Sequence, residues 1–236
     1  MSTSTARTHD RAVQMREATA SALNLNALLA KFLPTGASAV TARQEGLSAG
    51  ISASYRLAHT DLPRLRRFQS AFEATGVKYA LPPALLAAIA SRESRAGGAL
   101  DVNGLGCGGD CFGMMQLDSR YHPPRGGPYS TEHIDQAARV LERLLEEVKV
   151  KHPGWPPEQQ LRGALAAYDS GVCCVRTIKD MDRGTTGDDY SNDVWARAQA
   201  LAPYFGSVEG AGAGPISGTF RSLRDPLSVP GGKAVS

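Results

Sequence analysis

The residues of this 236-residue chain that could do chemistry together lie between positions 93 and 118. Glu93 follows an apolar run at 85–90, in a helix that the proline pair 82–83 begins and the glycine pair 97–98 is expected to end. A carboxyl group on such a helix is partly removed from water, which favours its neutral form and raises its pKa. A neutral acid can protonate a leaving oxygen, as in glycoside hydrolysis. That reaction needs a second carboxyl group, and Asp118 is the candidate.

Each of these two acids also has a purely structural interpretation. A glutamate near the C-terminus of a helix is usually a solvated surface residue, and the helix dipole disfavours its anion there. Asp118 could serve only to cap the following turn. The positions of Glu93 and Asp118 therefore indicate catalysis only together with the motifs around them.

The elements that must position these groups are mainly helices. Apolar residues at helical spacing predict helices over residues 60–75, 81–95, 131–151 and 193–204, and a further helix beginning at Pro157. In the clearest of them, 131–151, Thr131 is the expected N-cap. Five glycines between 101 and 118 predict tight turns and a small hairpin. The expected fold class is α+β and mainly α-helical, with a small β-hairpin beside the cleft.

Five groups of short motifs follow one another along the chain. They are Glu45-Gly46-Leu47-Ser48 with Ser52-Ala53-Ser54; Ile89-Ala90-Ser91-Arg92-Glu93-Ser94; Phe112-Gly113-Met114-Met115-Gln116-Leu117-Asp118; Ala167-Tyr168-Asp169-Ser170-Gly171; and Met181-Asp182, Gly184-Thr185-Thr186, Asp188-Asp189-Tyr190 and Asn192-Asp193-Val194. In this order they resemble the goose-type (g-type) lysozymes, glycoside hydrolases that cleave the glycan of bacterial peptidoglycan. One such motif is a weak signal, but five in order are specific. The resemblance covers residues 45–205 and implies the lysozyme-like fold.

The resemblance implies a muramidase that hydrolyses the β-1,4 bond between N-acetylmuramic acid and N-acetylglucosamine with inversion. Glu93 corresponds to the general acid, and Asp118 to the group that positions or deprotonates the attacking water. The implied substrate-binding residues are Gln116, His122, Tyr168, Asp169 and Tyr190. For these five the alternative is structural: an amide in the cleft wall, a surface histidine, or core tyrosines whose hydroxyl groups are satisfied.

The chain departs from the family pattern at two positions. Cys107 stands where the family usually has a second aspartate, and a thiol at its ordinary pKa cannot replace a carboxylate as a water-activating base. Asp110 could stand in for that aspartate. Asp169 replaces the usual asparagine and adds negative charge to the cleft. These departures leave a second interpretation, in which the protein is catalytically weakened and binds peptidoglycan or an inhibitor. A lytic transglycosylase is the other alternative, although Asp118 favours hydrolysis.

Composition agrees with this interpretation without deciding it. The net charge of +3, 42% hydrophobic residues and 21% charged residues are ordinary for a globular protein. No basic run interleaved with aromatic residues indicates a nucleic-acid surface, and no apolar window is long enough for a membrane span. The first residues lack the pattern of a secretory signal. The resemblance nevertheless implies action in the cell wall, periplasm or extracellular space, and the sequence does not indicate the route. The expected partners are peptidoglycan and a proteinaceous lysozyme inhibitor, and the expected state is a monomer.

The four cysteines, at 107, 111, 173 and 174, flank the expected cleft. Their spacing does not match a zinc ribbon, so free thiols or one or two loop-bracing disulfides are expected, with no metal and no organic cofactor. The expected organisation is an N-terminal extension over 1–42, a catalytic domain over 43–205 and a flexible tail over 206–236 that is rich in Gly, Ser and Pro. Within the extension, residues 10–32 could form a helix.

Overall fold

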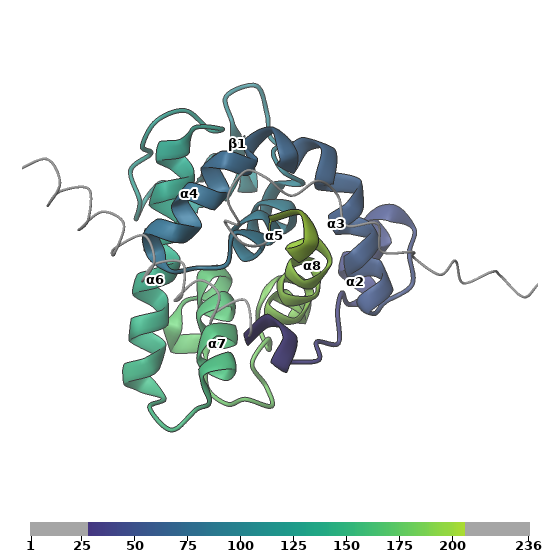
Figure 1. The fold of residues 1–236 in the computed structure, drawn as a ribbon, viewed down its shortest axis with the longest axis vertical. Coiled ribbons are helices and arrows are strands. Elements are labelled where there is room, and N and C mark those ends of the chain that lie inside the picture. The colour runs from purple at the N-terminus through teal and green to yellow at the C-terminus, as the bar shows by residue number, and fades with distance from the viewer. Residues whose placement is uncertain (1–27, 206–236) are drawn as a thin grey trace, which may run out of the picture.

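Helix α5 (Pro83–Ser94) carries Glu93 and lies at the centre of the region that the computed structural model describes, residues 28–205 (Figure 1). Ten of its residues are buried, and only Arg92 and Glu93 are partly exposed. A helix that is apolar on all sides is stable only inside a core, and the alanines of α5 allow its neighbours to approach closely. Glu93 therefore extends from one of the most enclosed elements of the molecule.

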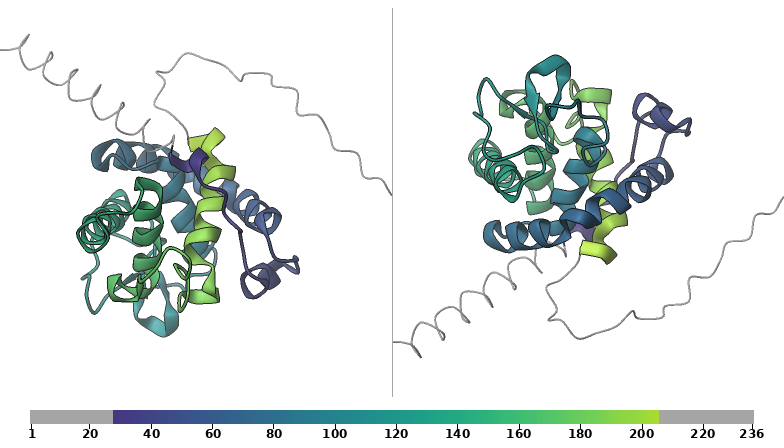
Figure 2. Two further views of the ribbon diagram at one scale, coloured as in Figure 1. Left: turned by 90° about the horizontal axis from the view of Figure 1, so that it is seen from below. Right: turned by 90° about the horizontal axis from the view of Figure 1, so that it is seen from above.

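The other helices surround α5. They are α2 (Ala39–Ala42), α3 (Ile51–Leu65), α4 (Gln69–Tyr79), α6 (Thr131–Lys151), α7 (Pro157–Ser170) and α8 (Tyr190–Phe205). In both views of Figure 2, α8 lies beside α5, with α6 and α7 on one side of the pair and α2 and α3 on the other. The mainly helical α+β fold class expected from the sequence is confirmed.

The end of α5 differs from the expectation. The helix ends at Ser94, where Arg95 adopts the left-handed conformation with φ 58°, followed by Ala96 with φ 54°. The glycine pair at 97–98 was therefore the wrong terminator. Arg95 can hold this unfavourable conformation because its guanidinium pairs with the buried carboxylate of Asp61, at 3.0 Å, and with Glu45.

Three further helix predictions need correction. The helix expected over 60–75 is two helices, α3 and α4, separated by a 3-10 turn at Arg66–Phe68. Helix α6 begins as expected, but its N-cap is Ser130, whose hydroxyl accepts the amide of His133, rather than Thr131. Helix α8 begins at Tyr190, three residues before the expected start, because Asp182 accepts the first amides of the helix, those of Ser191 and Asn192.

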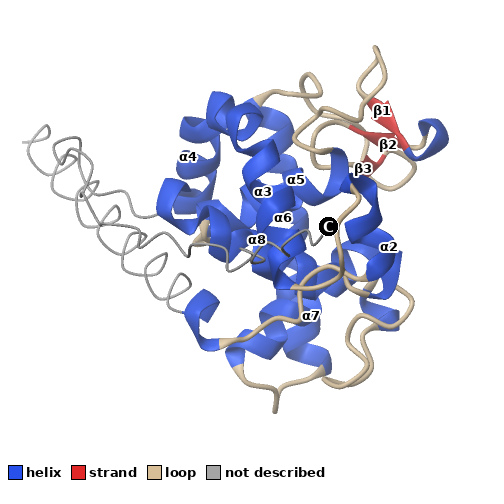
Figure 3. Cartoon of the chain, turned by 90° about the vertical axis from the view of Figure 1, so that its right-hand side faces the viewer, coloured by secondary structure: helices blue, strands red, loops and turns tan. Residues whose placement is uncertain are grey.

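The small β element is a three-stranded antiparallel sheet at the edge of the helical body (Figure 3). Its strands are β1 (Leu105–Gly106), β2 (Cys111–Phe112) and β3 (Leu117–Asp118). Gly113, with φ 75°, turns the chain after β2, and an added Cβ there would lie 2.5 Å from the His133 ring. The same ring accepts the Met115 amide through Nε2 at 3.0 Å, so α6 fixes the segment that leads to Asp118.

The described N-terminal residues pack on α8. Leu29 is 3% exposed, and its carbonyl oxygen accepts Trp195 Nε1 at 3.0 Å and Gln199 Nε2 at 2.7 Å. Residues 28–31 are helical, but the rest of the helix expected at 10–32, and the tail at 206–236, lie outside the described residues. The boundary at 42–43 stays a prediction. Within 28–205, no helix combines the length and the apolar character needed to cross a bilayer.

Candidate active site

A cleft of about 690 Å³ runs between the end of α5, the sheet, α6 and the C-terminal end of α7. Glu93 and Asp118 both line it. The other lining residues are Cys107, Cys111, Gln116, Leu117, Tyr121, His122, Val140, Arg143, Leu144, Ala167, Tyr168, Asp169, Gly171 and Thr186. The structure thus brings six of the eight predicted site residues to one cleft, and Asp110 and Tyr190 are the two that do not line it.

The Glu93 carboxyl is the most perturbed acid of the cleft. Burial raises its pKa from an ordinary value of 4.5 to about 7, and the negative charge of Asp169 acts in the same direction. The Tyr190 hydroxyl donates a hydrogen bond to Glu93 Oε1, and this bond, together with the charge of Arg92, opposes the rise. Glu93 is therefore held in one orientation and keeps its proton to a higher pH than an ordinary glutamate.

Arg92 anchors the end of α5 through a buried ion-pair network. Its guanidinium pairs with Asp189 at 2.9 Å and with Asp193 at 2.7 Å, and its side chain is only 6% exposed. It also donates to the carbonyl oxygen of Thr186 and to the hydroxyl of Thr41. Because Tyr190 lies between the two aspartates in sequence, Arg92 holds the segment that supplies the hydroxyl group to Glu93.

The Asp118 carboxylate lies in a different environment. It is 28% exposed on β3, and its pKa is held below the ordinary value by hydrogen bonds from Arg120, whose Nη2 lies 2.6 Å from Oδ2. Asp110 is 56% exposed and contacts the same Arg120 at 3.4 Å. Asp110 therefore reaches the cleft only through Arg120, as a neighbour of the Asp118 ion pair.

Gln116 and the thiols of Cys107 and Cys111 line the same cleft as the two acids. Gln116 adopts a left-handed conformation with φ 48°, and its Nε2 donates to the Gly113 carbonyl at 2.7 Å. Its Oε1 lies 3.8 Å from Cys107 Sγ, which acts as a weak donor. Burial and the neighbouring Cys107 raise the pKa of Cys111 to about 12. The Cys111 thiol therefore stays neutral beside Glu93.

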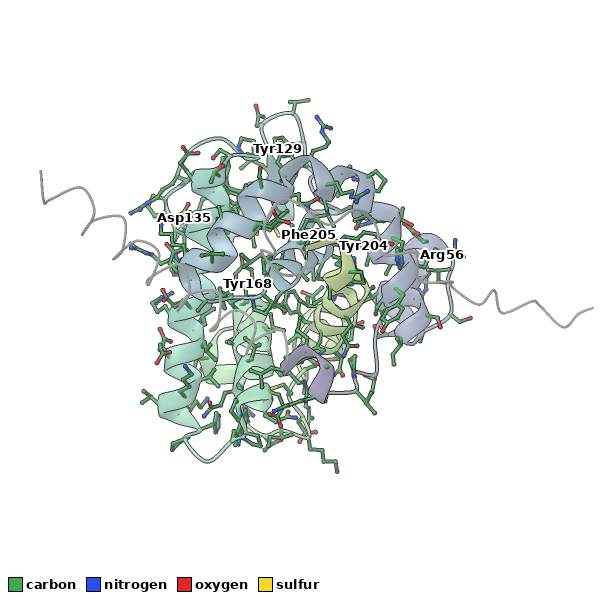
Figure 4. All side chains as sticks on the ribbon, viewed as in Figure 1. Arg56, Tyr129, Asp135, Tyr168, Tyr204 and Phe205 are labelled. Atoms are coloured by element: carbon green, nitrogen blue, oxygen red, sulfur yellow. The ribbon has the colours of Figure 1, made fainter. Side chains whose placement is uncertain are left out.

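The two predicted sugar-contacting tyrosines differ. Tyr168 lines the cleft. In the view of Figure 4 its label lies near the middle of the molecule, whereas Arg56 and Asp135 lie toward the edges of the molecule. Its hydroxyl donates to the Met115 carbonyl at 2.8 Å, which joins α7 to the sheet segment. Tyr190 is 1% exposed, and its hydroxyl is engaged by Glu93. Little of the Tyr190 ring can face a sugar, so its position indicates support of Glu93.

Asp169 is fixed at the C-terminal end of α7. Its Oδ2 accepts the amide of Thr186 at 2.8 Å, an interaction that joins α7 to the loop preceding α8. An ionised carboxylate suits this acceptor role, and its charge acts on Glu93 across the cleft. The replacement of asparagine by aspartate at 169 therefore alters the acid directly.

His122 lines the cleft, and its amide donates to the Asp118 carbonyl at 2.9 Å. Its pKa is lowered by burial and then by the positive charge of Arg143. Sequence reasoning missed Arg143 and Tyr121, which also line the cleft. It also missed the Arg92 network, because Asp189 and Asp193 lie about a hundred residues from Arg92 in the sequence.

The cysteines are four free thiols, and Cys173 Sγ lies 3.7 Å from Cys174 Sγ. Within residues 28–205, no three His, Cys, Asp or Glu side chains gather in a way that could hold a metal ion. An acid whose pKa is raised and a carboxylate whose pKa is lowered share one cleft, an arrangement that suits acid–base chemistry.

Comparison with known proteins gives consistent results. The sequence matches the family described as Lysozyme g over residues 29–204. It is 45% identical over 166 residues to lysozyme g of Gallus gallus, covering 70% of this chain and 78% of that protein. It is 44% identical over 173 residues to lysozyme g of Takifugu rubripes, covering 70% and 90%. A "Glycine, glutamate and proline-rich protein" of Lottia gigantea is 44% identical over 186 residues, which are 72% of this chain but only 43% of that protein.

Proposed function

The chain belongs to the lysozyme g family and is a glycoside hydrolase of the lysozyme type with peptidoglycan as its substrate; from this premise we propose that Glu93 and Asp118 carry out the hydrolysis. The bond cleaved is the β-1,4 linkage between N-acetylmuramic acid and N-acetylglucosamine, with inversion at the anomeric carbon. One observation carries the proposal: a single cleft holds one carboxyl whose pKa is raised to about 7 and one whose pKa is lowered. Such opposed environments distinguish an acid from a carboxylate that acts as an anion.

Glu93 acts as the general acid. With a pKa near 7 it retains its proton at mildly acidic pH and can transfer it to the glycosidic oxygen as the bond breaks. The Tyr190 hydroxyl holds the carboxyl and stabilises the anion that remains after the transfer. Because the Arg92 network fixes the segment that bears Tyr190, the acid needs little reorganisation during the reaction.

Asp118 positions the attacking water. Its lowered pKa keeps it ionised at the pH where Glu93 is protonated, so it can accept a hydrogen bond from water on the other face of the sugar. Arg120 holds the carboxylate through three hydrogen bonds and limits its rotation. Asp110 contributes only through Arg120, and Gln116, His122, Tyr168 and Asp169 line the space for the glycan.

Product analysis of purified peptidoglycan tests this proposal. Hydrolysis gives free reducing ends, and inversion gives α-configured ends in the first minutes, which proton NMR distinguishes from the β form. Products ending in 1,6-anhydro sugars would instead establish a transglycosylase. The absence of any products from folded protein would establish a binding protein, the alternative that Cys107 and Asp169 kept open.

Two further partner assignments belong to the same proposal. We expect the protein to act as a monomer, since one chain supplies every group assigned above, and sedimentation at working concentration checks this. A proteinaceous lysozyme inhibitor would have to reach Glu93 through the cleft. Competition between such an inhibitor and a glycan oligomer is the expected observation.

A further inference from the structure

The charges that line the cleft are unevenly distributed. Three carboxyl groups line it, those of Glu93, Asp118 and Asp169. Among the described residues that line it, Arg143 is the one lysine or arginine. A cleft that served only to bind an uncharged glycan would need no cation, so Arg143 requires a separate explanation.

Arg143 lines the cleft together with His122 and Asp118. It belongs to α6, where Val140, one turn earlier, and Leu144, the next residue, line the same cleft. His122 lines the same cleft, and the positive charge of Arg143 acts on its ring. Arg143 therefore lies on the surface of the cleft that also holds Asp118.

The side chain of Arg143 remains available to a ligand. The side chain is 58% exposed. It forms an ion pair at 3.3 Å with Glu147, which lies one turn later on α6 and is 44% exposed. An ion pair between two exposed side chains contributes little stability and exchanges readily. A carboxylate that arrives in the cleft can replace Glu147, which does not line the cleft.

We propose that Arg143 binds a carboxylate of peptidoglycan and is the residue of the cleft through which acidic substituents of the glycan strand strengthen binding. This inference rests on the proposed function and adds to it the basis of substrate selection. Peptidoglycan offers two sources of this one chemistry, the lactyl carboxyl of muramic acid once it is free and the carboxylates of the stem peptide. The planar guanidinium group matches a carboxylate with two parallel N–H···O bonds, which favours arginine over lysine at such a position.

Binding measurements can test this separately from catalysis. In a Glu93→Gln background, calorimetry would measure the Kd of three oligomers with equal numbers of sugars: a chitin oligomer, a glycan whose stem peptides an amidase has removed, and the intact muropeptide. Arg143→Gln should weaken binding of the carboxylate-bearing oligomers by about threefold to tenfold, the range of a partly exposed charge pair, and change chitin binding by less than about twofold. Arg143→Lys should fall between Arg143→Gln and the parent.

Arg139→Gln is the matched control, since Arg139 is exposed on the same helix, one turn earlier, and does not line the cleft. It should leave all three Kd values unchanged. An effect on the stripped glycan assigns the contact to the lactyl carboxyl, and an effect confined to the intact muropeptide assigns it to the stem; both support the proposal.

Three results would overturn the inference: equal weakening of chitin and peptidoglycan oligomers, no weakening of either, or the same weakening by Arg139→Gln. The last would mean a general attraction of charge. Failure of the proposed function has a different signature, because it would be seen as absence of reducing ends from protein with Glu93 intact, whatever the Kd values are.

Discussion

The two acids of the cleft belong to parts of the molecule that are built differently. Glu93 ends a buried helix and is held by Tyr190 and, through it, by the Arg92 network. Asp118 lies on a two-residue strand at the molecular edge and is held by Arg120, which is 63% exposed. The first environment excludes water and keeps the proton on its carboxyl. The second admits water and keeps its carboxylate charged.

This contrast shows how one cleft assigns two chemical roles to the same functional group. The pKa of Glu93 rises because burial penalises the anion, and that of Asp118 falls because a guanidinium stabilises it. The helical part therefore specifies the acid through packing, whereas the sheet part specifies the water-positioning group through a local ion pair. Mutations that convert one environment toward the other should change activity in predictable directions.

The largest effect is expected from Glu93→Gln, which cannot donate the proton. Turnover of peptidoglycan should fall on the order of a hundredfold or more. The fold should persist, and at pH 8 thermal unfolding should occur at the same temperature or higher. An ionised Glu93 costs stability as pH rises from 4.5 through 7, because its pKa is raised in the folded state, and glutamine removes this cost. The control is Glu142→Gln, a change at an exposed residue of α6, which should leave turnover unchanged. Wild-type turnover by the Glu93→Gln variant would exclude Glu93 as the acid.

The next largest effect should separate the two aspartates that share Arg120. Asp118→Asn should reduce kcat by about tenfold to a hundredfold, because the water loses its oriented acceptor. Asp110→Asn should reduce it by less than about threefold, since the Asp110 side chain is exposed and pairs with Arg120. Initial rates of reducing-end release measure both. If the two residues share the water, each single variant keeps partial activity and the double variant almost none; equal severe losses would place Asp110 in the site.

The two thiols of the sheet offer a smaller effect. With iodoacetamide at pH 7.5, Cys111 should be alkylated about tenfold or more slowly than an ordinary exposed thiol, because its pKa of about 12 leaves little thiolate. Peptide mass mapping over time gives the individual rates of all four cysteines. In denaturant the four should react alike and completely. A pair that stays unlabelled there and reacts only after reduction would mean a disulfide.

The smallest effects concern the pH dependence of kcat. Activity should fall as pH rises through about 7, where Glu93 loses its proton. Tyr190→Phe removes a hydrogen bond that lowers this pKa, so the alkaline limb should move to higher pH; Asp169→Asn removes a charge that raises it, so the limb should move to lower pH. Shifts of up to about one pH unit are expected. Shifts in the same direction for both variants would contradict the assignment of Glu93 to this limb.

Some of this organisation was predictable from sequence because its signals are local. The apolar run before Glu93, the amphipathic pattern of α6 and the glycines around the sheet each determine structure within a few residues, and the predicted helices and turns are confirmed there. The family resemblance is also confirmed. The roles of Asp118 and the substrate-binding residues stay predictions.

Other features could not be predicted because they depend on distant residues. Arg92 lies 97 and 101 positions from its two aspartates, and no local pattern indicates which charges will meet. The left-handed Arg95 is stable only because Asp61 and Glu45, far earlier in the chain, receive its guanidinium. A glycine pair two residues later was the better local terminator, and tertiary ion pairs overrode it.

The contact of Leu29 with Trp195 and Gln199 has a mechanical consequence. These hydrogen bonds join the two ends of residues 28–205, so tension applied through both ends would load them first. Tyr190 begins the same helix that carries Trp195, five residues earlier and on the side of Glu93. A molecule pulled between residues 28 and 205 should therefore yield at this junction while the cleft keeps its geometry.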